Sequence, residues 1–152
     1  MKTGHADKAR ELFNEGYNCS QAVLGAFAED AGLDVKTAFR LSAPFGGGMG
    51  RMREVCGGVS GMFMAIGLFF GYDEPDGAQA KKELYSYVRA LADKFKESEG
   101  SIICRELLAG VKTQPGPDPE PRNTADYKKP VPRARRIRGA ARRGLLKRTR
   151  KA

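Results

Sequence analysis

Three cysteines, Cys19, Cys56 and Cys104, are the residues of this sequence whose side chains are best suited to chemistry. Each one lies where the local pattern predicts the first turn of a helix. Asn18 is a favourable N-cap before Cys19, and Ser101 is expected to cap the helix that carries Cys104. The N–H groups and the partial positive charge of a helix N-terminus stabilise a thiolate. The three thiols are therefore candidates for nucleophilic, redox or metal-binding chemistry.

Cys56 opens an apolar run, VCGGVSGMFMAIGLFFG over residues 55–71, that contains no charged side chain. Its first glycines, Gly57, Gly58 and Gly61, occupy adjoining positions of the predicted helix and leave a surface without Cβ atoms. Another helix backbone could approach this surface closely, or a cofactor could bind there. Both interpretations stay open at this point.

Two arginines, Arg51 and Arg53, lie just before Cys56, and their positive charges would further stabilise its thiolate. The run GGGMG at residues 46–50 precedes them and predicts a loop or a tight turn. The structural alternative is that the three cysteines are core residues, because cysteine is among the most buried residue types and packs as a small hydrophobe.

The composition argues against histidine-based sites. His5 is the only histidine, and it lies close to the N-terminus, so neither a Ser-His-Asp triad nor a histidine metal cage is expected. The first ten residues contain no apolar segment typical of a signal peptide, and the number of cysteines is odd. These features predict a cytoplasmic protein with thiols, a transient disulfide or a bound metal in a reducing compartment.

Apolar residues recur at helical spacing through most of the first 110 residues, which predicts an all-α fold. A compact bundle of about five to six helices is expected around the glycine-rich helix, which would be buried on all sides. That helix is short and rich in glycine for a transmembrane segment, so no membrane span is predicted. The predicted helices cover residues 6–15, 19–31, 35–41, 55–71, 78–99 and 103–110.

Charge and composition divide the chain near residue 110. Residues 128–152 contain twelve Lys or Arg and no Asp or Glu, whereas residues 1–127 carry a slight net negative charge. We expect a cysteine-containing redox domain over residues 1–110, followed by a Pro-rich linker and a disordered basic tail over residues 111–152. The tail could bind nucleic acid nonspecifically through phosphates, although no recognition fold accompanies it. Its composition is also typical of a frameshifted GC-rich coding sequence.

Three segments around the cysteines resemble one known family. NCSQAVL around Cys19, FGGGMGRMREVCGGVSG around Cys56 and SIICREL around Cys104 are similar, in this order, to the redox-active proteins named for the C_GCAxxG_C_C pattern. The resemblance covers about residues 6–110 and matches three of the family's four cysteines, because no cysteine follows Cys104. Gly58 replaces the alanine of the family's Cys-Gly-Ala-x-x-Gly signature.

The resemblance implies redox activity in the cytoplasm of a bacterium or archaeon, with a redox partner that the sequence does not identify. We therefore hypothesise a thiol oxidoreductase in which Cys56 is the nucleophile and Cys19 or Cys104 is the resolving partner in a reversible disulfide.

A metal site is the alternative hypothesis, because a related domain occurs in some multihaem cytochromes. Cys19, Cys56 and Cys104 would then be thiolate ligands of a metal ion or an iron–sulfur cluster. The fourth ligand would be exogenous or would come from another subunit. A homodimer is also suggested by the high apolar content of the helical part.

Overall fold

The structure is a computed structural model that describes residues 4–110 and 114–119 of the chain. Within these residues the chain is helical, as the periodicity predicts, and its β-type pairing is limited to a single bridge. The chain from residue 120 onward lies outside the described residues, so disorder, a frameshift and nucleic-acid binding of the tail stay predictions. The elements are α1 (His5–Asn14), α2 (Cys19–Ala28), α3 (Val35–Ser42), the 3₁₀ turn η1 (Ala43–Phe45), α4 (Gly57–Phe70), α5 (Ala78–Glu99) and α6 (Cys104–Leu107).

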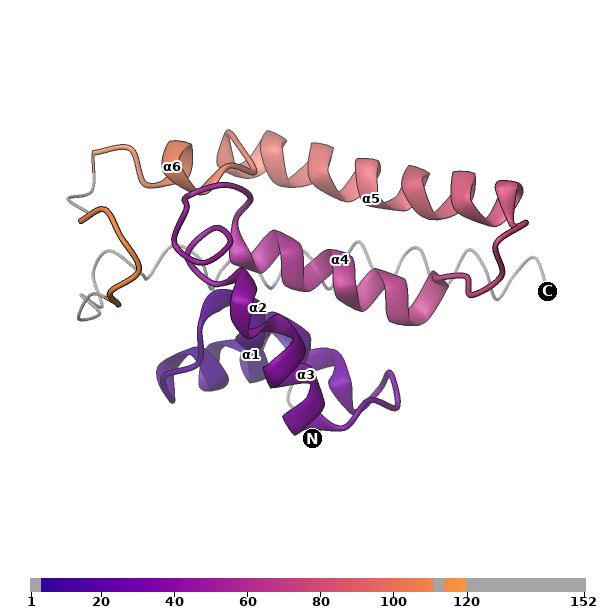
Figure 1. The fold of residues 1–152 in the computed structure, drawn as a ribbon, viewed down its shortest axis with the longest axis horizontal. Helices are drawn as coiled ribbons and strands as arrows, with labels where there is room; N and C mark the ends of the chain where they lie inside the picture. Colours follow the sequence, from indigo (N-terminus) through magenta and orange to yellow (C-terminus); the bar gives the residue numbers. More distant parts are fainter. Residues whose placement is uncertain (1–3, 111–113, 120–152) are drawn as a thin grey trace.

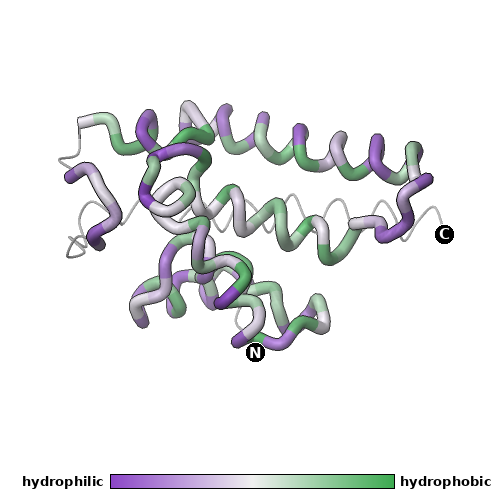
Figure 2. The backbone as a smooth tube through the Cα atoms, in the orientation of Figure 1, coloured by the Kyte–Doolittle hydropathy of each residue, from purple (hydrophilic) through white to green (hydrophobic). Residues whose placement is uncertain are grey.

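Helix α4 lies between two groups of helices (Figure 1). α5 runs alongside one side of α4, and α1, α2 and α3 pack together on the other side. Apolar residues of α5 face α4, which Figure 2 shows in green. The burial of α4 is uneven, since Leu68 is 42% exposed whereas Val59 is fully buried, so the helix is not covered on every side. The main core includes Val23, Leu24, Phe27, Val59, Met62, Ile66, Leu91 and Phe95.

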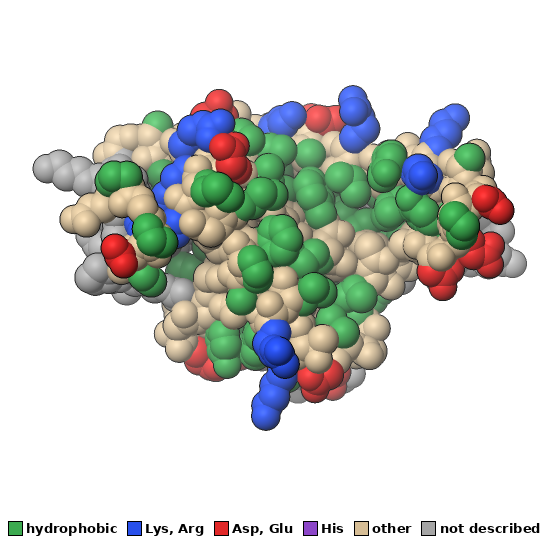
Figure 3. Space-filling view, viewed as in Figure 1, with side chains coloured by type: hydrophobic (Ala, Val, Ile, Leu, Met, Phe, Trp, Pro, Cys, Tyr) green, Lys and Arg blue, Asp and Glu red, His purple; other side chains and the backbone are tan. Residues whose placement is uncertain are grey.

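Basic and apolar side chains are distributed unevenly over the surface (Figure 3). Apolar side chains form a band between α4 and α5, while Lys and Arg side chains gather at the end of the molecule that carries α6. Among the described residues, no helix combines the length and the apolar character needed to cross a bilayer.

Side-chain caps fix the N-termini of α2 and α3, as the sequence predicts. Asn18 Oδ1 accepts a hydrogen bond from the Gln21 N–H at 2.9 Å, and Gln21 Oε1 accepts one from the Asn18 N–H at 3.1 Å, which completes a capping box. At α3, Asp34 accepts hydrogen bonds from the Thr37 backbone N–H and hydroxyl. These bonds, led by the one from the backbone, lower the pKa of the Asp34 carboxyl.

The predicted cap of the last helix is wrong. Ile103, not Ser101, is the N-cap of α6, and its backbone is extended, with φ −91° and ψ 125°. Ile103 is extended because it pairs across an antiparallel bridge with Val55, which delays the start of the helix. Ser101 Oγ instead accepts a hydrogen bond from the Ile103 N–H at 3.0 Å and donates one to the Glu106 carboxylate.

Helices α2 and α4 approach closely where α4 lacks side chains. A Cβ atom on Gly61 would lie 2.8 Å from the carbonyl oxygen of Ser20. A Cβ atom on Gly57 would lie 2.9 Å from the carbonyl oxygen of Phe45 and 3.3 Å from the Ser20 nitrogen. Packing against other backbone segments therefore accounts for both glycines. A cofactor-binding role for Gly57, Gly58 and Gly61 stays a prediction.

Substitution of Gly61 by alanine should destabilise the fold by about 1–3 kcal/mol, because the added methyl group must push α2 away from α4. Gly67→Ala on the same helix is the matched control, since its Cβ would have no neighbour within 4 Å. That variant should gain about 0.5–1 kcal/mol from the higher helix propensity of alanine. Urea unfolding of the full chain measures both changes, and equal effects of the two variants would contradict the proposed contact.

Candidate functional site

An antiparallel bridge brings two of the three cysteines together. Val55 pairs with Ile103, the Cys56 N–H donates to the Ile102 carbonyl at 2.8 Å, and the Cys104 N–H donates to the Glu54 carbonyl at 2.6 Å. In this register Cys56 and Cys104 are diagonal neighbours on one face of the bridge, whose Cα atoms are typically about 7–8 Å apart. Residues 48 positions apart in the sequence thus present their thiols on the same side.

The third cysteine reaches the same region through the contact between α2 and α4. Cys19 is the first residue of α2, and a Cβ atom on Gly57 would lie 3.4 Å from Cys19 Cβ. Cys19, Cys56 and Cys104 all line one cavity of about 440 Å³, which we call the thiol cavity. Cys56 and Cys104 are only 7% and 8% exposed, and Cys19 is half-buried. All three are present as thiols.

The loop that precedes α4 wraps the thiol cavity and has an unusual backbone. Five successive residues, 47–51, have positive φ values between 57° and 70°, and Arg53 follows at 60°. Met49, Arg51 and Arg53 are not glycines, so each costs about 1–2 kcal/mol in this left-handed region. The GGGMG run therefore forms a loop, as predicted. Figure 1 shows its coil beside the start of α4.

The two arginines of this loop have different neighbours. Arg53 Nη1 lies 3.9 Å from Cys104 Sγ, a contact that the sequence order does not indicate, while an effect of either arginine on Cys56 stays a prediction. The Arg51 guanidinium donates to the carbonyl oxygens of residues 114, 116 and 118, at 3.2 Å and 2.8 Å for the first two. The two arginine side chains thus contact one cysteine sulfur and one backbone segment.

The segment that Arg51 holds also contributes to the thiol cavity. Pro117 and Pro119 line it, together with Leu107 and Leu108 from the end of α6. Sequence reasoning missed these contributions, because a Pro-rich segment beyond residue 110 gave no signal of its spatial neighbours. The predicted boundary at residue 110 itself stays a prediction, but residues on both sides of it line the same cavity.

The described residues do not fit a metal ion or an iron–sulfur cluster by themselves. In residues 4–110 and 114–119, no three His, Cys, Asp or Glu side chains are grouped so that they could hold a metal. The predicted ligand set of Cys19, Cys56 and Cys104 shares a cavity without forming such a group. Thiols that line one cavity can in principle react in turn with a small molecule.

Alanine at Gly48 should distort the thiol cavity, because its Cβ would lie 2.6 Å from Cys104 Cβ and 2.8 Å from the Glu54 nitrogen. Gly50→Ala is the matched control, since Gly50 has a similar φ of 57° but no neighbour within 4 Å of its Cβ. Both variants should lose about 1–2 kcal/mol from the left-handed backbone. Gly48→Ala should lose about 1–3 kcal/mol more from overpacking.

Urea unfolding and the alkylation rate of each thiol, mapped by mass spectrometry, measure these effects. Only Gly48→Ala should accelerate alkylation of Cys104, because it displaces the backbone of the bridge. If the two variants had the same stability and the same alkylation pattern, the packing of Gly48 against Cys104 would be wrong.

Comparison with known proteins identifies the family of the chain. The sequence matches the family described as putative redox-active protein (C_GCAxxG_C_C) over residues 17–135, which include all three cysteines and the segment that lines the thiol cavity. Searches of curated proteins and of solved structures gave no match. Because the family match spans well over half of the sequence, the chain belongs to the C_GCAxxG_C_C family of putative redox-active proteins.

Proposed function

We propose that this protein is a dithiol redox protein that exchanges electrons with small disulfides and thiols through a reversible Cys56–Cys104 disulfide. The observation that carries the proposal is the lining of one cavity by three thiols and two arginines. Small substrates are favoured over protein disulfides, because Cys56 and Cys104 are each less than a tenth exposed. The cavity also has the volume of a small-molecule site.

Cys56 is the proposed nucleophile. It is the N-cap residue of α4, a helix of 14 residues, and the first N–H groups and the dipole of a helix attract anionic groups at that end. Cys104 is the proposed partner, because the Arg53 guanidinium near its sulfur would stabilise the thiolate that must attack or leave. A disulfide needs Cα atoms about 4.4–6.8 Å apart. Diagonal neighbours about 7–8 Å apart must therefore approach by at least about 0.2–1.2 Å to enter this range.

The reaction has two exchange steps. The Cys56 thiolate attacks one sulfur of a small disulfide, so that a mixed disulfide forms and the first small thiolate leaves. The Cys104 thiolate then attacks Cys56 Sγ, the Cys56–Cys104 bond forms, and the second small thiolate leaves. The protein dithiol loses two electrons, the substrate disulfide gains them, and the released thiolates take protons from water. In the reverse direction, two external thiolates reduce the Cys56–Cys104 disulfide through the same two steps.

Titration of the reduced, metal-free full chain with oxidised glutathione under anaerobic conditions tests the proposal. Two of the three thiols should disappear together. The protein mass should fall by two hydrogen atoms, and peptide mapping should find a Cys56–Cys104 crosslink. Cys19→Ser should retain the reaction. Cys104→Ser should stop at a mixed disulfide on Cys56, and Cys56→Ser should form no Cys104 crosslink.

Three outcomes would contradict this assignment in different ways. A crosslink between Cys56 and Cys19 would show that Cys19, the other resolving partner that the sequence predicts, takes the place of Cys104. Absence of any intramolecular disulfide over the whole redox range would reject the dithiol cycle. Stoichiometric iron or zinc in anaerobically purified protein, lost with any single cysteine variant, would favour the metal hypothesis with ligands from outside the described residues.

A further inference from the structure

Arg53 has a hydrogen-bonding group that the described residues leave unused. Its Nη1 atom lies near Cys104 Sγ, but its Nη2 atom is buried and has no hydrogen-bond partner. A buried donor on a charged group without an acceptor is costly, and natural structures usually satisfy such groups with protein, water or a ligand. Arg53 also lines the thiol cavity, so an anion bound in the cavity can reach its guanidinium.

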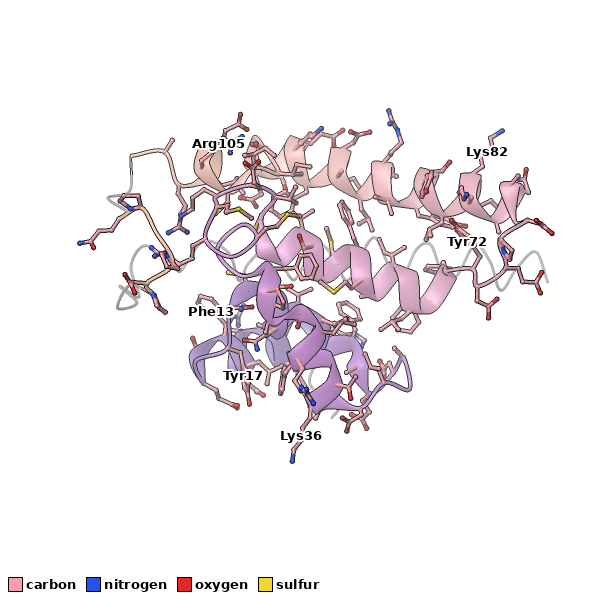
Figure 4. The ribbon with its side chains drawn as sticks, viewed as in Figure 1. Phe13, Tyr17, Lys36, Tyr72, Lys82 and Arg105 are labelled. Carbon is pink, nitrogen blue, oxygen red and sulfur yellow. The ribbon has the colours of Figure 1, made fainter. Side chains whose placement is uncertain are left out.

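The nearby charges do not neutralise Arg53. Glu54 is the adjacent acid, but its Oε1 atom pairs with Arg105 Nη1 at 3.1 Å. Figure 4 shows Arg105 on α6 beside the loop. Arg105 Nη1 also donates to the Arg53 carbonyl oxygen at 3.3 Å, so the Arg53 backbone is held from the same side. In the part of the chain that the structure describes, no carboxylate pairs with the Arg53 guanidinium.

We propose that the Arg53 guanidinium binds the carboxylate of the small thiol or disulfide substrate, so that the protein selects anionic sulfur compounds. The inference rests on the proposed function for its sulfur chemistry. The guanidinium is planar and rigid, so an anion bound to it lies close to the nitrogen that faces Cys104 Sγ. Because Cys56 and Cys104 line the same cavity, a substrate whose carboxylate lies close to its sulfur could contact Arg53 and the thiols together.

The apolar residues of the cavity wall are compatible with a short substrate of this kind. Leu107, Leu108, Pro117 and Pro119 supply apolar contacts, while Arg51 is engaged with backbone carbonyls. A charge-assisted hydrogen bond from a partly buried guanidinium discriminates more strongly than one on the surface. Arg53 would thus set the charge preference, and the apolar wall would limit the substrate's size.

Rates of dithiol oxidation by two disulfides of similar size test this selectivity. Dithiodiglycolate carries two carboxylates, and bis(2-hydroxyethyl) disulfide is neutral. Each rate for the reduced full chain is divided by the rate of dithiothreitol with the same disulfide, which removes intrinsic reactivity. The wild-type chain should prefer dithiodiglycolate by about tenfold or more. Arg53→Gln should abolish most of this preference.

Arg89→Gln is the matched control, because it removes one positive charge from an exposed position on α5 outside the cavity. This variant should keep the preference. If Arg53→Gln does not fold, Arg53→Lys is used instead. This variant keeps the positive charge but loses the paired N–H donors of the guanidinium, so it should lose part of the preference for dithiodiglycolate. An unchanged preference in the Arg53 variant, or an equal loss in Arg89→Gln, would overturn the proposal.

Calorimetric titration with thiodiacetate separates the carboxylate site from the redox function, because this thioether cannot exchange with thiols. Binding to the wild-type chain and not to Arg53→Gln would support the site even if no protein disulfide ever formed. Disulfide formation with neither a charge preference nor thiodiacetate binding would retain the dithiol function and reject the carboxylate site.

Discussion

The thiol cavity depends on one pair of backbone hydrogen bonds. The Cys56 N–H bonds to Ile102 and the Cys104 N–H bonds to Glu54, on either side of the Val55–Ile103 bridge. These two bonds join the start of α4 to the start of α6, so both helices begin at the same place and present their first thiols on one face. Without the bridge, the polar contacts of the short helix α6 with this segment would include those of Arg105 with the Arg53 carbonyl and the Glu54 carboxylate.

Glycines make this arrangement sterically feasible. Gly48 lets the loop pass directly over Cys104, and Gly57 and Gly61 let α2 approach the backbone of α4. The same loop holds three non-glycine residues in the left-handed region, a conformation that surrounding contacts must stabilise. Near the cavity, favourable contacts therefore offset the backbone strain that gives the site its shape.

The two arginines of the loop have different contacts. Arg51 donates hydrogen bonds to the backbone carbonyls of residues 114, 116 and 118, and these bonds hold a Pro-rich segment against the cavity. Arg53 turns towards Cys104 and keeps one buried donor for an acceptor outside the protein. The cavity therefore combines a largely apolar wall with an arginine that keeps an unused donor, which is an arrangement suited to binding a small anion.

The sequence by itself determined the helices, because their signals are local. The Asn18 cap, the apolar spacing of α5 and the C-terminal Gly100, which has a φ of 92°, act within a few residues of the elements they define. The family motifs identified the three cysteines and the class of chemistry.

Only the tertiary structure decided which groups meet. The start of α6, the direction of the Arg53 charge and the presence of Pro117 in the cavity all follow from contacts between residues about 50 or more positions apart. Such contacts depend on the register of one bridge and on how the loop turns, and neither has a local sequence signal. For this reason the sequence could name the thiols and their nearest arginines but could not assign one arginine to Cys104.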